Sequence, residues 1–156
     1  MKAIRRSPAR SLLRIVVSVV AMLALAAASA LAVVTSDSYR GRTSQGKIAS
    51  LRVSQGVIHN FVMRWLARCT MTHQTVTNTT IFHALVLDGS RFKANGRSLA
   101  SVAKGYSSHF VTSSRGAFST TSVRGTFAGT MKVYRDSSHT LVDVCQSGTF
   151  SFVLTG

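Results

Sequence analysis

Acidic residues are the scarcest component of this sequence. Its 156 residues include 19 Lys and Arg, but only four Asp and no Glu. Paired carboxylates carry out most glycoside hydrolysis, and four scattered aspartates do not predict such a pair. The excess of positive charge instead favours an anionic partner, because net charge bears on association and solubility rather than on fold.

Proline and cysteine are also rare. The one proline is Pro8, near the start of the chain, and the two cysteines are Cys69 and Cys145. In an exported protein two cysteines normally pair, so we predict a disulfide bond between them. That bond leaves no thiol nucleophile and no thiolate set for a metal. The sequence predicts neither a metal site nor a cofactor.

The N-terminal region has the pattern of an export signal. Residues 1–14 are basic, residues 15–34 form an apolar run, and small-residue cleavage sites follow at residues 28–30 and 30–32. We predict a signal peptide over residues 1–32 and a secreted or cell-envelope protein. The alternative is an uncleaved hydrophobic helix, residues 15–34, that anchors the domain outside the membrane. After the leader, fourteen Lys and Arg face four Asp, a formal charge of +10.

The stretch Val57–Cys69 shows the clearest periodicity. Its odd positions include Phe61, Met63, the single Trp65 and Cys69, and a period of two places alternate residues on one face of a strand. No window of helical length shows a period of 3.6, and turn signals recur about every 8 to 12 residues. We therefore predict an all-β fold, a single antiparallel β-sandwich or barrel of about eight strands.

The expected organisation is a flexible lead-in over residues 33–46, followed by one β domain over residues 47–156. Residues 99–105 are ambiguous, because Leu99, Val102 and Ala103 also fit one helical turn, and residues 99–108 are the least determined part. The expected strands are Lys47–Val53, Val57–Cys69, Thr75–Thr80 at an edge, Ile81–Leu87, a short one from Arg91, Tyr106–Thr112, Ala117–Val123, Thr126–Arg135, Leu141–Cys145 and Thr149–Leu154.

The first hairpin allows two registers. A two-residue loop, Gln55-Gly56, would place Leu51 opposite Asn60. A three-residue loop that also includes Ser54 places Leu51 opposite His59 and keeps the apolar residues on one face. We expect the second register, which makes His59 a core residue.

Several short pieces together resemble a group of small exported actinobacterial all-β proteins of unassigned function. The resemblance implies an all-β domain with one disulfide, and it implies no activity. The matching pieces are Gly41–Gly46 (GRTSQG), Cys69, Gly89–Phe92 (GSRF), Val123–Phe127 (VRGTF), Gly129–Val133 (GTMKV) and Cys145–Gly148 (CQSG) followed by Phe150 and Phe152.

Basic residues are spread one or two to a strand, without a Lys/Arg run, a zinc pattern or a Gly-rich phosphate loop. Nucleic acid is therefore not the expected partner. Arg64 and Arg68 share the outward face of the central strand, and the expected register adds Arg52. We predict that Arg52, Arg64 and Arg68 form a basic face that binds an anionic envelope polymer or an acidic protein.

The leading functional hypothesis is thus a non-enzymatic binding module at the cell envelope. The first alternative is a small secreted hydrolase that uses a His/Asp pair such as His139 with Asp143, although the sequence contains no G-x-S-x-G motif and we predict no catalytic residues. The second alternative is a purely structural envelope protein, which an even distribution of charge over the fold would favour.

Overall fold

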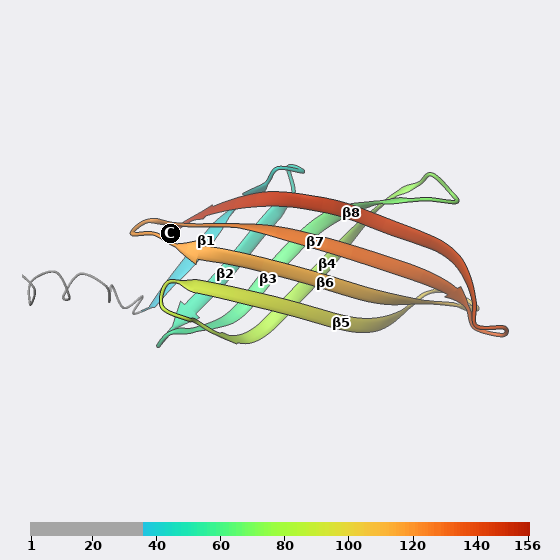
Figure 1. Ribbon diagram of the computed structural model, residues 1–156, viewed down its shortest axis with the longest axis horizontal. Coiled ribbons are helices and arrows are strands. Elements are labelled where there is room, and N and C mark those ends of the chain that lie inside the picture. The colour runs from blue at the N-terminus through green and yellow to red at the C-terminus, as the bar shows by residue number, and fades with distance from the viewer. Residues whose placement is uncertain (1–35) are drawn as a thin grey trace, which may run out of the picture. The chain divides into compact units, whose positions relative to one another are not determined.

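The computed structural model describes residues 36–156, which form a single all-β unit of eight antiparallel strands (Figure 1). The strands are Ser36–Thr43 (β1), Ile48–Ser54 (β2), Val57–Cys69 (β3), Thr75–Val86 (β4), Arg91–Ala103 (β5), Tyr106–Phe118 (β6), Ser122–Arg135 (β7) and Thr140–Thr155 (β8). Residues 36–156 include no helix that is long and apolar enough to cross a membrane.

All eight strands belong to one sheet in the order β4-β3-β2-β1-β8-β7-β6-β5. Strands β1–β4 pair in sequence order, as do strands β5–β8, and β1 pairs with β8. The edges of the sheet are therefore β4 and β5. The sheet folds over on itself, and β5–β8 cross over β1–β4 (Figure 1). The ring of strands is therefore closed at β1–β8 and open between β4 and β5.

A second pairing, between β3 and β8, closes part of the ring more tightly. The C-terminal end of β3 extends past the first residue of β2 and reaches β8, where Arg68 pairs with Gln146 and Cys69 with Cys145. Just before this junction the side chain of Gln45 replaces a strand partner: its Oε1 accepts from the Leu66 amide at 2.8 Å and its Nε2 donates to the Leu66 carbonyl at 3.1 Å. No residue of β2 lies opposite Leu66. Because buried backbone groups need partners, the Gln45 side chain takes the place of the missing strand there.

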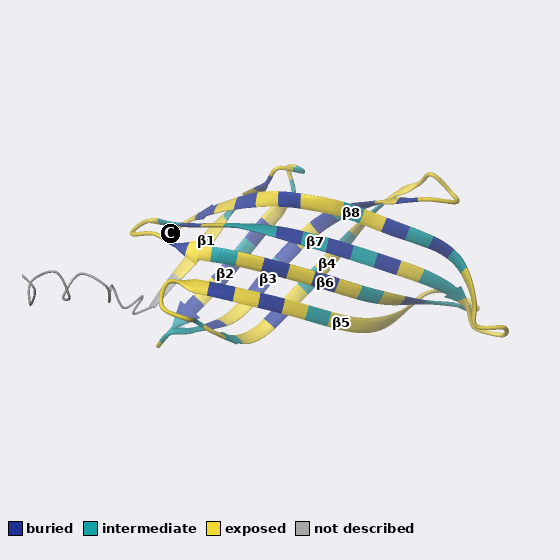
Figure 2. Cartoon of the chain, viewed as in Figure 1, coloured by how far each residue is buried: buried dark blue, intermediate teal, exposed yellow. Residues whose placement is uncertain are grey.

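The core lies between the two crossing layers, and the alternation of buried and exposed residues along the strands is visible in Figure 2. Aromatic rings dominate it, in contact with one another at centroid distances of 5.2 to 6.4 Å. The buried aromatic residues are Tyr39, Phe61, Trp65, Phe82, Phe92, Phe118, Phe127, Phe150 and Phe152.

Glycines on the inner face make room for these rings. One row across β5–β8 reads Phe92, Gly116, Gly125 and Phe152. A Cβ on Gly116 would meet the Phe92 ring at 2.6 Å, and one on Gly125 would meet the Phe152 ring at 2.4 Å. Phe61 of β3 contacts both rings, with centroid distances of 5.5 and 5.4 Å. The two glycines thus allow three phenylalanine rings to share one layer of the core.

Trp65 makes the corresponding contact on β7. A Cβ on Gly129 would lie 2.8 to 2.9 Å from three atoms of the indole ring, which therefore rests directly on the backbone of β7. The indole Nε1 donates a hydrogen bond to Thr80 Oγ1 at 3.1 Å, so the polar atom of this fully buried side chain has a partner. Buried tryptophans commonly satisfy their N–H in this way.

The prediction of an all-β antiparallel domain of about eight strands is confirmed. The architecture, however, is one continuous sheet with partial ring closure rather than two separate sheets or a fully closed ring. The predicted signal peptide or anchor, residues 1–32, lies outside the described residues.

The expected register of the first hairpin is wrong, and so is the placement of His59 in the core. The loop has two residues, Gln55 and Gly56, both with positive φ (51° and 74°), which suits the twist of a tight hairpin. Ser50 pairs with Val62 and Val53 with Ile58, so β3 has one extra residue in a bulge. His59 and Asn60 are consecutive exposed residues at that bulge, which restores the inward parity of Phe61.

Other boundaries also differ from expectation. Residues 36–43, assigned to the flexible lead-in, form β1 between β2 and β8. The two strands expected over residues 75–87 are one strand, β4. Residues 99–103 contain no helical turn, because β5 continues to Ala103. The strand expected over residues 117–123 is instead the end of β6, a turn at residues 119–121 and the start of β7.

We predict that Gly129→Ala lowers the free energy of unfolding by about 1 to 3 kcal/mol, because the new methyl group must displace the indole of Trp65. Urea denaturation measures the change. Ala128→Ser on the outer side of the same strand is the control and should stay within about 0.5 kcal/mol of the parent. A Gly129→Ala variant as stable as the parent would show that the ring does not rest on β7.

Candidate functional site

Cationic side chains gather on the outer surface of the sheet, along β5–β8 and the adjoining strand β1. One cross-strand row runs from Arg42 on β1 through Val153 and Arg124 to Ala117 and Arg91 on β5. The three arginines are exposed and occupy every second strand. Because neighbouring strands lie about 4.8 Å apart, these arginines follow one another at intervals of about 10 Å.

A second pair of cations lies one row away. Lys93 of β5 pairs directly with Arg115 of β6, and both side chains are exposed. Like charges directly opposite each other on a sheet are destabilising. Arg115 Nε donates a long hydrogen bond of 3.4 Å to the hydroxyl of Thr126. We refer to Arg42, Arg91, Lys93, Arg115 and Arg124 as the cationic face.

A shallow hollow of about 220 Å³ lies beside this pair. Its polar lining consists of hydroxyl, amide and cationic groups from four adjacent strands, and the small residue Ala128 provides the depth. Such a hollow offers several hydrogen-bond donors to an anionic group. The polar side chains that line it are Lys93, Asn95, Ser113, Arg115, Thr126 and Thr149.

Carboxylates do not neutralise the cationic face. Within residues 38–156 the three aspartates are Asp88 and Asp136, both exposed in turns, and Asp143, which is buried. Asp88 precedes Arg91 in the β4–β5 turn and pairs with it through backbone hydrogen bonds. No ion pair joins side chains within this range, so the cationic face keeps its full charge toward solvent.

The three arginines predicted from sequence as a binding face are all exposed, Arg52 on β2 and Arg64 and Arg68 on β3. Arg68 is four positions after Arg64, a distance of about 13 Å along a strand. Arg64 lies opposite Thr79, and Arg68 opposite Thr75 and Gln146. The structure therefore spaces these arginines along the back layer without bringing two of them together.

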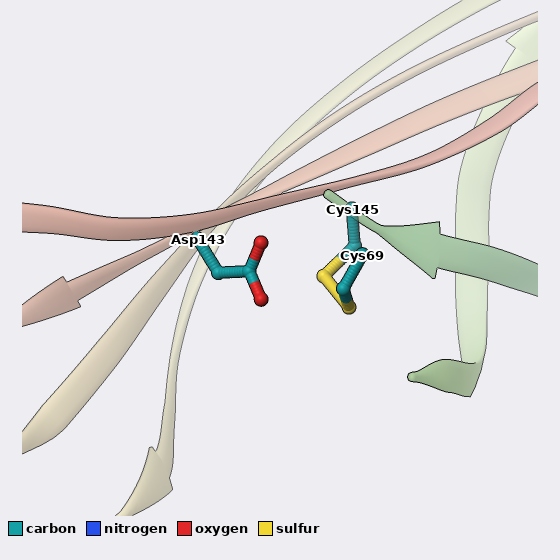
Figure 3. A group of neighbouring side chains, drawn as sticks. All are labelled: Cys69, Asp143 and Cys145. Carbon is teal, nitrogen blue, oxygen red and sulfur yellow. A yellow bond between two sulfur atoms is a disulfide. The ribbon is translucent and has the colours of Figure 1, made fainter. Parts of the chain in front are cut away.

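The predicted disulfide is present. Cys69 and Cys145 form an S–S bond of 2.03 Å at the junction of β3 and β8 (Figure 3). The bond joins residues that are 76 positions apart in sequence. It therefore fastens the end of the central strand to the last strand at the point where the ring closes.

Asp143 lies beside the disulfide and holds the loop that follows β3 (Figure 3). Its carboxylate accepts hydrogen bonds from the Met71 amide at 3.0 Å, from the amide and hydroxyl of Thr72 at 3.2 and 2.8 Å, and from the Val144 amide at 2.8 Å. The Met71 amide contributes most to lowering the pKa of Asp143 from 3.8 to about 2, against the opposing effect of desolvation.

Cys69, Asp143 and Cys145 place three ligand-type atoms within 4.8 Å of one another. Both sulfur atoms belong to the disulfide, however, and are not thiolates, which metal coordination by cysteine requires. The carboxylate of Asp143 is already used by four donors. The chemistry of this group does not fit a metal centre.

The His/Asp pair of the hydrolase hypothesis gains no support from the geometry. His139 is exposed at the β7–β8 turn, with a positive φ of 52°. His139 is not among the hydrogen-bond partners of Asp143, whose low pKa and four donors suit a structural carboxylate. A general base would need to face an open cleft and a substrate.

Sequence reasoning missed most of the cationic face. Arg42 lies in the expected flexible lead-in. The other members of the face lie on separate strands, and their proximity depends on cross-strand register, which the sequence does not reveal.

Comparisons of the chain with protein families, with curated proteins and with solved structures found no match.

We predict that the Cys69→Ala, Cys145→Ala double variant loses up to about 4.5 kcal/mol of unfolding free energy, the chain-entropy value for a loop of this length. Equilibrium denaturation of the oxidised parent and of the double variant measures the loss. Alkylation followed by intact-mass analysis should find no free thiol in the oxidised parent. Two alkylated cysteines in that sample would contradict the bond.

The lowered pKa of Asp143 predicts a specific acid sensitivity. The unfolded chain takes up the proton near pH 3.8 and the folded protein only near pH 2, so this contribution to stability is complete above about pH 4 and is lost as the pH falls toward 2. Denaturation curves between pH 2 and 5 should show the loss in the parent. Asp143→Asn should be less stable at pH 5 and should lack this part of the pH dependence, whereas the exposed-turn control Asp136→Asn should retain it.

Proposed function

We propose that this domain is a non-enzymatic binding module for an anionic polymer of the cell envelope. The observation that carries the proposal is the cationic face, five cations in two neighbouring rows of one sheet with no carboxylate paired to them. Net charge by itself does not indicate where a ligand binds, but an ordered row of cations marks one surface of the sheet. A chain of regularly spaced phosphate or carboxylate groups is the ligand that matches it.

The geometry of the sheet supports this ligand class. Arg42, Arg124 and Arg91 project from backbone positions that the ladders fix, at intervals of about 10 Å. Guanidinium groups bind phosphate and carboxylate oxygens in a bidentate manner. A ligand that bridges several of them gains from each contact without ordering the backbone further, because the strands are already in place.

The hollow beside Lys93 and Arg115 provides a place for one anionic group of the polymer. Two cations at directly opposed positions repel each other in the free protein. An anion placed between them relieves that repulsion and also meets the hydroxyl of Thr126. The pair that destabilises the empty sheet is therefore expected to contribute most to binding.

Location at the envelope is supported by the disulfide, because such bonds persist in oxidising compartments outside the cytoplasm. The expected export signal lies outside the described residues and adds nothing structural to this inference. An acidic protein is the other partner class suited to such a charge, and a purely structural envelope protein needs no ligand. The experiment below distinguishes a polymer-binding module from a purely structural protein.

The test compares two variants that lose the same charge on different faces. One carries Arg91→Gln, Arg115→Gln and Arg124→Gln on the cationic face. The other carries the three sequence-predicted positions, Arg52→Gln, Arg64→Gln and Arg68→Gln. Co-sedimentation with teichoic-acid-bearing walls and binding to heparin are measured at about 50 and about 200 mM salt, a range over which phosphate contacts lose much affinity.

We expect the parent to bind both polymers with a steep salt dependence. The cationic-face variant should lose at least about tenfold in affinity, and its salt slope should fall by about two to three. The matched variant on β2 and β3 should lose much less. Equal losses would mean that only net charge matters, a larger loss in the second variant would place the site on the back layer, and a parent without salt-sensitive binding would contradict the proposed function.

A further inference from the structure

The space between β4 and β5 is an open seam in the sheet. The two strands are the edges of the sheet and are joined only by the bridge between Asp88 and Arg91 at their turn. Phe82 of β4 then packs over Gly96 of β5. Beyond that contact the strands take different directions (Figure 1) and border a hollow of about 340 Å³. The hollow is lined by residues 78–81 of β4, by residues 96–98 and Ala100 of β5, and by Phe110 and Thr112 of β6.

The backbone of β5 presents unused hydrogen-bonding groups to this seam. Arg91 exchanges backbone hydrogen bonds with Asp88, so its N–H and C=O face β4. Ala100 lies at the opposite parity, and its carbonyl faces β6, where it accepts from Ser108 Oγ. Because the direction alternates along a strand, the N–H and C=O groups of Arg97 and Leu99 face the seam.

The side chains along this edge indicate which kind of strand would fit. From Arg97 to Lys104 every residue of β5 and its turn is exposed, including Leu99 at 73% and Val102 at 46%. The charged residues of this edge, Lys93, Arg97 and Lys104, are all cations. An exposed edge with apolar side chains is a ready template for strand addition.

One buried polar atom points to the same place. Asn78 on β4 lines the seam, and its Nδ2 is the one buried side-chain nitrogen or oxygen without a hydrogen-bond partner among the described residues. A buried donor left unpaired costs free energy. A carbonyl or carboxylate oxygen from a strand in the seam would supply its acceptor.

We propose that the seam binds an extended acidic segment of another protein, which adds to the edge of β5 as a ninth strand. Its backbone pairs with Arg97 and Leu99, its acidic side chains lie on the outer side beside Arg97, and its small apolar side chains face inward. A second copy of this chain is a poor occupant, because edge-to-edge pairing of β5 would bring the same cations together. This site is separate from the polymer site proposed above.

The test uses fluorescence anisotropy with the disulfide-intact protein and a short blocked peptide in which glutamate alternates with valine. The key variant is Leu99→Pro, which removes one seam-facing N–H and leaves the bonds to β6 in place, since proline is tolerated at the open side of an edge strand. Leu99→Ala, which keeps the N–H, is the matched control. We expect Leu99→Pro to weaken peptide binding by about tenfold or more, the cost of a buried acceptor without its donor, and Leu99→Ala by less than about threefold.

Two further measurements separate loss of peptide binding from misfolding of Leu99→Pro and from binding at the polymer site. The same peptide with alternate backbone nitrogens methylated should not bind the parent protein. Heparin binding should be unchanged in Leu99→Pro. Equal binding of the methylated peptide, or loss of peptide binding in the Arg91→Gln, Arg115→Gln, Arg124→Gln variant but not in Leu99→Pro, would overturn the proposal and make the peptide one more polyanion on the cationic face.

Discussion

The close contact between aromatic rings and glycine backbone is the constraint on which the rest of this structure depends. Trp65 rests on Gly129, and Phe61 enters the layer that Gly116 and Gly125 leave free. These contacts bring the two crossing layers so close that aromatic rings fill the space between them. Whatever this domain binds must therefore be recognised by its outer surface and its strand edges, where side chains and backbone groups are free.

The ring of strands is fastened on one side and open on the other. On one side β3 is joined to β8 by the Cys69–Cys145 bond. Gln45, just before β2, bonds the backbone of Leu66 where β3 extends past the start of β2. Asp143 then ties down the loop after β3 through amide hydrogen bonds. On the other side β4 and β5 separate without a ladder. The Cys69–Cys145 bond holds β3 against β8, so the curvature of the sheet does not depend on a pairing between β4 and β5.

Much of the fold could be predicted because it depends on local periodicity. The inward parity from Phe61 to Cys69 is visible in the sequence, and so is the pairing of two lone cysteines. The register at His59 was not, because a bulge inserts one residue and leaves no compositional mark. β1 and residues 97–103 of β5 could not be predicted as strands for another reason. β1 has few apolar residues, and residues 97–103 are exposed on both faces, so neither segment shows a period of two.

The candidate site was harder to predict than the fold, because it exists only across strands. Parity along β3 revealed Arg64 and Arg68, whereas the position of Arg115 opposite Lys93 requires the registers of β5 and β6. That pair also bears on function. Two cations at directly opposed positions cost stability, and a threonine or an acidic residue at either position would remove the cost. A chain with so few carboxylates leaves the repulsion to be relieved from outside, and an anionic ligand is the simplest agent that does so.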